Sequence, residues 1–257
     1  MKNRVMTIGL STFLLVACGS AWAQTTAPAV TNAPPGAPVW HGDVATGLSL
    51  ARGNANTFLL NGEASAENVW DKNDLKFGGD GVYALNNYGQ TNQTRAAEAI
   101  HGFSDYKRLF NERLYGDLRL DFFHDDVADV RYRGIIGPAL GYYFIKTDAS
   151  KLNADLGASY LRQRLDDDGN IGYAALHASE HGEHKFSKTA RIWEFVEYYP
   201  ELTQWSNYLV NSEAGAEAAL NTRFSLRVQV DDHFNHKPAT GRKENDILLV
   251  SSLVYKY

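Results

Sequence analysis

The chain has 257 residues and a formal net charge of −5, from 30 acidic and 25 basic side chains. Hydrophobic residues make up 44% of it, which is enough for a packed structure and excludes wholesale disorder. The acidic balance argues against a nucleic-acid partner, and the single Cys excludes a disulfide framework and a multi-cysteine metal site.

The N-terminus has the features of a secretory signal peptide. A basic start precedes an apolar stretch over residues 5–17 and a small-x-small pattern at residues 21–23, so residues 1–23 are predicted to direct export. The residues that end at Cys18 also resemble a lipobox, and Cys18 is therefore either lipidated or removed with the signal peptide. Residues 24–38, rich in Pro, Ala and Thr, are expected to form a flexible tail.

From residue 39 onward the dominant pattern is a period-two alternation of apolar and polar side chains. In residues 223–231, Phe224, Leu226, Val228 and Val230 share one face and polar side chains occupy the other. Similar patterns occupy residues 58–67, 74–83, 114–125, 152–160, 208–220 and 246–257. Because such alternation predicts strands with one apolar face, and no helical stripe of comparable length occurs, the fold class is all-β.

Connections between these stretches alternate between two kinds. Short ones fall at residues 71–73, 111–113, 147–150, 187–188 and 221–222. Longer polar ones fall at residues 53–56, 86–93, 125–131, 166–170, 202–207 and 236–245. Aromatic residues gather near both kinds, as they do at the two interfaces of a membrane. Residues 39–257 are thus predicted to form an antiparallel up-and-down transmembrane β-barrel of about 12 strands, of outer-membrane type, in a bacterial outer membrane.

Two local features refine this prediction. Leu253, Tyr255 and the terminal Tyr257 share one parity, an arrangement that resembles the C-terminal signal read by the outer-membrane barrel assembly machinery. Pro138 lies inside an apparent strand, where it lacks the N–H of a ladder hydrogen bond. We expect a bulge or a local bend at this proline.

If the apolar faces meet lipid, the opposite faces line the lumen, and acidic side chains predominate there. The candidate lining residues are Glu63, Asp80, Asp117, Arg119, Asp121, Asp155, Glu213, Glu217, Arg227 and Asp231. A water-filled lumen of this charge attracts cations and repels anions, which predicts a narrow cation-favouring pore. Twelve strands enclose little space, however, and charged side chains that pair across it give the alternative of a plugged structural barrel.

Catalytic and metal-binding patterns are weak. His177 and His181 stand about 13 Å apart along a strand, too far to bind one zinc ion unassisted. His124 has a lipid-facing parity near an outer strand end, where the base of a lipid- or lipopolysaccharide-modifying enzyme would lie, but no serine motif pairs with it. We therefore expect no enzyme and no cofactor, with such an enzyme as the alternative. The expected partners are outer membrane lipids and lipopolysaccharide, the assembly machinery, and small cations or solutes.

Several segments also resemble one family. They are WHGD (residues 40–43), TGLSLARGN (46–54), RIW (191–193), EYYP (197–200), KEND (243–246) and LVYKY (253–257). In this order they are similar to the YdiY-like salt-induced outer membrane proteins, the family of unknown function 481. The resemblance covers residues 40–257 and implies an outer-membrane barrel. Its name implies a link to salt or osmotic stress, and it brings no catalytic residues.

Overall fold

The computed structural model describes residues 40–51, 56–166 and 169–257, which form one compact unit. The predicted signal peptide (1–23) and tail (24–38) lie outside the described residues, and these predictions stay untested. All regular elements in the described ranges are strands: β1 (Trp40–Ala51), β2 (Thr57–Trp70), β3 (Asn73–Asn86), β4 (Thr94–Leu109), β5 (Leu114–Asp125), β6 (Val130–Lys146), β7 (Ser150–Leu165), β8 (Gly169–Lys185), β9 (Ala190–Pro200), β10 (Tyr208–Ala219), β11 (Phe224–Asn235) and β12 (Asn245–Lys256). Within these ranges no helix is long and apolar enough to cross a membrane.

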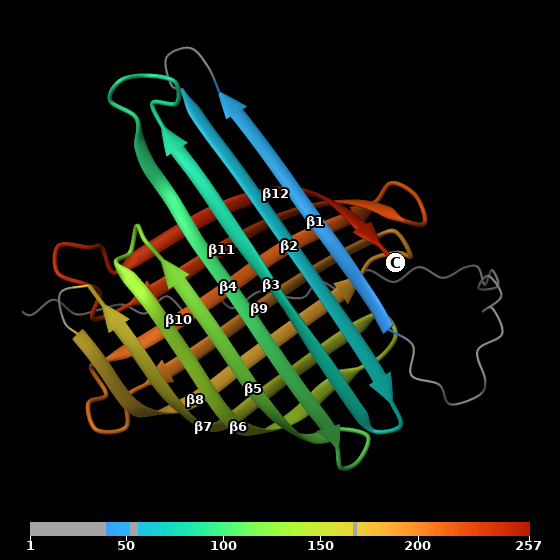
Figure 1. The fold of residues 1–257 in the computed structure, drawn as a ribbon. Helices are drawn as coiled ribbons and strands as arrows, with labels where there is room; N and C mark the ends of the chain where they lie inside the picture. The colour runs from blue at the N-terminus through green and yellow to red at the C-terminus, as the bar shows by residue number, and fades with distance from the viewer. Residues whose placement is uncertain (1–39, 52–55, 167–168) are drawn as a thin grey trace, which may run out of the picture. The chain divides into compact units, whose positions relative to one another are not determined.

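The strands close into a barrel. Each strand pairs antiparallel with its neighbours in sequence, and β12 returns to β1 (Figure 1). Short turns lie at the end where β1 begins and β12 ends, as in the two-residue β2–β3 connection, where Asp71 adopts a positive φ of 50°. Asp tolerates that left-handed conformation better than most residues do. The predicted twelve-stranded, up-and-down barrel of outer-membrane type is confirmed.

Two of the predicted longer loops are wrong in length. The connections after β5 and β7 span only residues 126–129 and 166–168, because β6, β7 and β8 are 17, 16 and 17 residues long and continue past the predicted strand ends. The longest connection described throughout is 236–244, between β11 and β12. This loop is the element best placed to cover the mouth of the barrel.

The outer face of the barrel is apolar. Leu48, Leu140 and Ile247 are 60–69% exposed, and many further large apolar side chains share this face. Aromatic side chains meet at both ends of it, for example Phe224 with Tyr255 near the short turns. This is the surface of a protein whose strands face lipid, since exposed apolar area of this extent is unfavourable in water.

Pro138 causes no bulge, so the first of the two alternatives expected there is wrong, and the local bend stays a prediction. The β6–β7 register is the same before and after it, from Ile136 opposite Tyr160 to Ala139 opposite Gly157. Between these two pairs, Gly137 and Pro138 have no paired residue on β7. The register shifts of β6 against β7 lie instead near the ends of the strand. The missing N–H thus costs local ladder hydrogen bonds without adding a residue.

The seam between β1 and β12 is short. Residues 43–46 of β1 pair with residues 253–256 of β12, and Gly42 adds a hydrogen-bonded pair with Tyr257. By contrast, the whole of β1 pairs with β2. The barrel is therefore held most weakly where its first and last strands meet.

Candidate functional site in the barrel lumen

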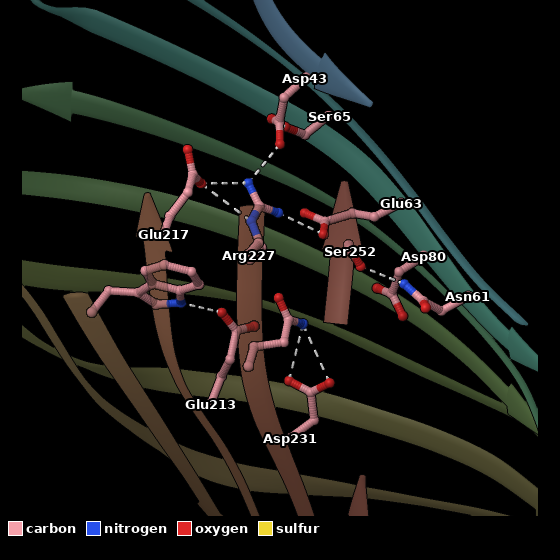
Figure 2. Close-up of polar contacts among 12 residues, drawn as sticks. Asp43, Asn61, Glu63, Ser65, Asp80, Glu213, Glu217, Arg227, Asp231 and Ser252 are labelled. Atoms are coloured by element: carbon pink, nitrogen blue, oxygen red, sulfur yellow. Dashed lines mark hydrogen bonds and ion pairs between the residues drawn. The ribbon is translucent and has the colours of Figure 1, made fainter. Parts of the chain in front are cut away.

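The ten residues predicted to line the lumen lie on six strands, and their side chains project to the interior. Figure 2 shows five of them on β2, β3, β10 and β11 around one arginine. The remaining residues lie on β5 and β7, where Asp121 contacts His101 of β4 and Asp155 accepts a hydrogen bond from Ser179 of β8. These residues form two charged clusters, each around one arginine, and His101 joins them through Asp80 and Asp121.

Arg227 is the centre of the first cluster. Its guanidinium donates to Glu63 at 2.7 Å, to Asp43 at 2.8 Å and to Glu217 at 3.1 Å (Figure 2). The side chain thereby reaches from β11 over β12 and β1 to β2. It can do so because the intervening inward positions hold small residues, such as Ala45 on β1.

Glu217 also forms ion pairs with other basic side chains. Arg191 of β9 donates to it at 2.9 Å, and Lys256 of β12 also bonds it. The neighbouring Glu213 accepts a hydrogen bond from the indole of Trp193. Trp193 lies directly over Gly215, where a Cβ would meet its ring at 2.2 Å. The glycine therefore makes room for the ring that holds Glu213 in place.

Arg119 is the centre of the second cluster. Its Nε donates to Asp121 at 2.8 Å, and its Nη1 lies 3.3 Å from Glu197 of β9. The guanidinium also lies over the rings of Phe103 and Phe195. Since three strands separate β5 from β9, this side chain crosses the interior of the barrel.

The lumen beside β5–β9 is filled with side chains. Tyr115, Leu161 and Tyr199 are fully buried, and Asp117 and Asp155 are each only 8% exposed. Each of these two aspartates has one carboxylate oxygen without a hydrogen-bond partner among the described residues. No water-filled passage is expected along this wall.

The wall formed by β2 and β3 is more accessible. The Asp80 side chain is 53% exposed and that of Glu63 is 29% exposed, although both face the interior. Asp80 bonds His101 at 2.9 Å, and among the described residues the nearby Asp231 bonds only the amide of Gln229. The accessible side of the lumen is therefore lined by carboxylates, and Lys76 of β3 is also exposed there.

The loop 236–244 covers the mouth at the end opposite the short turns. Arg242 makes a bidentate ion pair with Asp129 in the β5–β6 connection, with one N–O distance of 2.8 Å. Ala239 is buried against Val130 and Leu165. Because β11 and β5 lie on opposite sides of a twelve-stranded barrel, the loop spans the opening. The Arg242 guanidinium also holds the pKa of Asp129 below its usual range.

Beneath the loop the lumen narrows to a contact between opposite walls. The rings of Phe123 on β5 and His233 on β11 lie 5.6 Å apart, and Arg133 lies over the Phe123 ring. The cavity that remains there is about 40 Å³. Both the loop and this pair of rings therefore close the mouth.

Residues outside the lumen give little support for catalysis. Both ring nitrogens of His124 are engaged, by the Arg131 carbonyl at 2.9 Å and by Asp126 at 3.2 Å. Across the described ranges no group of three His, Cys, Asp or Glu residues is arranged to hold a metal ion. The C-terminal residues Leu253, Tyr255 and Tyr257 lie with exposed side chains at the short-turn end of the last strand.

The sequence reasoning missed several partners in these clusters. His101 lies on β4, and Arg191 and Glu197 lie on β9, outside the alternating stretches of the sequence, so no parity pointed to them. The Arg242–Asp129 pair joins residues 113 positions apart in two loops, and no local pattern announces it. Long-range pairs of this kind follow from the closure of the barrel.

Comparisons with known proteins add the following. Residues 44–257 match the family described as "Protein of unknown function, DUF481". An outer membrane channel from Pseudomonas putida F1 is 10% identical, with a TM-score of 0.47 and coverage of 91% of this chain and 100% of that one. The NanC porin is 6% identical, with a TM-score of 0.46 and coverage of 85% and 97%. The KdgM porin is 10% identical, with a TM-score of 0.43 and coverage of 85% and 99%. Curated proteins give no match.

Proposed function

This chain belongs to the DUF481 family, whose description names no function, and we propose that it forms a narrow, cation-favouring channel in the bacterial outer membrane. The observation that carries the proposal is the contrast in exposure between the lumenal carboxylates and the two lumenal arginines. Asp80 is 53% exposed in its side chain, whereas Arg227 and Arg119 are 6% and 18% exposed. An ion that enters the lumen therefore meets carboxylates rather than guanidinium groups.

Arg227 and Arg119 are each tied to two or more carboxylates, so their charge is largely compensated where they stand. Low-dielectric walls focus the field of the carboxylates, which outnumber these arginines, along the passage. Such a field raises the local concentration of cations and excludes anions.

The packing limits what can pass. Side chains fill the β5–β9 side of the lumen, and the loop 236–244 covers the mouth. Passage therefore requires movement of this loop, and the solutes are small inorganic cations rather than sugars or peptides.

The test is the ion selectivity of the refolded protein in a planar bilayer. The variant Asp80→Asn with Glu63→Gln should shift the reversal potential in a KCl gradient toward that of an unselective pore. The control variant Glu112→Gln with Asp148→Asn removes the same charge from exposed short turns and should leave the reversal potential unchanged. Equal selectivity of the lumenal variant and the unmodified protein would refute the assignment.

A plugged structural barrel is the second candidate, because the Arg242–Asp129 pair and the Phe123–His233 contact close the mouth. The two functions differ in the bilayer experiment. Heat-modifiable migration on a gel shows whether the Arg242→Gln variant is folded. If this variant is folded and still gives no conductance, the structural role is favoured. We propose no catalytic activity for either case.

Other parts of the proposal concern the envelope. We assign Leu253, Tyr255 and Tyr257 to recognition by the barrel assembly machinery, and Tyr257→Ala should lower the amount of barrel in the outer membrane. A role in salt or osmotic stress rests on the resemblance in sequence alone. Growth of a deletion strain at high NaCl tests it, and growth equal to that of the parent would count against it.

A further inference from the structure

Two arginines stand on the outer face of β7 near its loop end. Arg162 and Arg164 are exposed, and they share their parity with the lipid-facing Leu156 and Tyr160. The alternate residues of this strand, such as Leu161, are buried inside the barrel. The two guanidinium groups therefore point away from the lumen.

Their lack of partners distinguishes these arginines from others near the same rim. Neither Arg162 nor Arg164 makes an ion pair or a side-chain hydrogen bond with any described residue. By contrast, Arg95 pairs with Glu98, Arg131 pairs with Asp166 at 3.0 Å, and Arg242 pairs with Asp129. Two adjacent positive charges are thus left without a counter-charge from the described parts of the protein.

Their depth places them at the membrane interface. The outward residues of β7 are apolar from Leu152 to Tyr160, a rise of about 21 Å along the barrel axis for a strand tilted by ~40°. Arg162 lies about 5 Å beyond Tyr160, at the edge of an apolar band of roughly 25 Å. Lipid headgroups begin at that height, so a charged side chain there costs the protein little stability.

The surface around Arg162 is open on the β6 side, and on the β8 side the Tyr160 hydroxyl lies over Gly172. Its neighbours on the adjacent strands are Gly134 of β6 and Gly172 of β8, neither of which has a side chain. One step outward, Tyr132 donates a hydrogen bond of 2.6 Å to Asn170, across the level of Arg164. The two arginines are therefore flanked by polar and aromatic groups.

We propose that Arg162 and Arg164 bind the phosphate groups of lipid A, the membrane anchor of lipopolysaccharide, in the outer leaflet. The guanidinium group matches phosphate with two parallel hydrogen bonds, and adjacent headgroups at this height carry the missing negative charge. Acyl chains of the same molecule then pack on the apolar outer face below Tyr160. This inference is independent of whether the lumen conducts ions.

A neighbouring acidic hollow supplies a competing route to the same lipid. His124, Asp125, Asp126, Asp129, Arg131 and Asp166 line a surface cavity of about 200 Å³. Through these aspartates a divalent cation would bridge to a lipid phosphate, with no need for Arg162 or Arg164. The experiment separates this route from direct binding by arginine.

The protein, extracted in mild detergent and stripped of lipid, is titrated with lipid A and followed by native mass spectrometry. Arg162→Gln with Arg164→Gln should weaken binding on the order of tenfold. Arg108→Gln with Arg223→Gln, which removes the same charge at the opposite rim, should bind like the unmodified protein. Replacement of both rim arginines by Lys should retain part of the affinity, and heat-modifiable migration verifies that every variant is folded.

Three results would overturn the proposal. One is a glutamine double variant that binds lipid A as tightly as the unmodified protein does. Another is equal affinity of the unmodified protein for lipid A and for its dephosphorylated form. The third is binding that EDTA abolishes in the unmodified protein, which would assign the contact to a bridging cation in the acidic hollow.

Discussion

At the scale of single residues, the lumen depends on glycines that leave room for large polar and aromatic neighbours. Gly215 lies under Trp193, and Gly141 lies under Tyr115 and Asp155, at distances that no Cβ tolerates. Trp193 is held from its other sides by Arg191 and Arg227, which lie over its ring, and by its hydrogen bond to Glu213. A side chain at either glycine therefore displaces a group that other contacts hold in place.

Gly215→Ala is expected to destabilise the barrel by about 1–3 kcal/mol, since the added methyl group overlaps the Trp193 ring. The midpoint of urea unfolding in lipid vesicles measures the change. Gly62→Ala is the matched control, because nothing lies within 4 Å of its Cβ position, and it should leave the midpoint unchanged or raise it. Equal midpoints for the two variants would show that Trp193 can move aside at no cost.

The ion pair between Asp129 and Arg242, called the latch below, holds the loop 236–244 over the mouth. It predicts that the mobility of this loop depends on pH. Because Arg242 lowers the pKa of Asp129, the latch is fully formed above the ordinary pKa of an aspartate and is lost as the pH falls through the lowered value. The pair is partly exposed, so its contribution is about 1 kcal/mol or less. A spin label on Thr240→Cys should report the same restricted loop at pH 7 and pH 5 and a more mobile loop at pH 2.

Asp129→Asn should make the label mobile at all three pH values. Asp148→Asn, in a short turn at the other end of the barrel, is the control and should behave like the unmodified loop. A label that is equally restricted in Asp129→Asn at pH 7 would contradict the latch.

At the scale of elements, the β1–β12 seam is the weakest part of the wall. It pairs residues 43–46 with 253–256, while β2–β3 and β10–β11 pair over nearly their whole lengths. Unpaired backbone groups are costly in a hydrocarbon environment, so opening of the barrel is expected to begin at this seam.

A cross-link over the seam should raise the thermal stability of the barrel. Ala45 and Val254 are opposite each other and fully buried, so Ala45→Cys with Val254→Cys places two small thiols together in a barrel that has no other Cys beyond residue 18. The disulfide form is expected to unfold at a higher temperature than its reduced form. The same unfolding temperature for both forms would mean that opening starts elsewhere.

At the scale of the whole molecule, period-two alternation and turn residues were enough to predict the number of strands, their order and the closed barrel. They failed on the lengths of the connections at 126–129 and 166–168, because β6 to β8 gain pairing partners that no local pattern reveals. Parity also placed Asp80 and Arg227 on inward faces, yet it gave no account of which charges pair. That depends on strands brought together by closure, as when Arg227 of β11 meets Glu63 of β2.

The central claim is that the accessible carboxylates of the lumen favour cations, and the reversal potential of single channels in a KCl gradient tests it most directly. For the unmodified protein we predict discrete conductance steps and a reversal potential of the sign that K⁺ permeation sets. Arg242→Gln should give a reversal potential of the same sign and should open more often. A reversal potential of the opposite sign, set by Cl⁻, would contradict it.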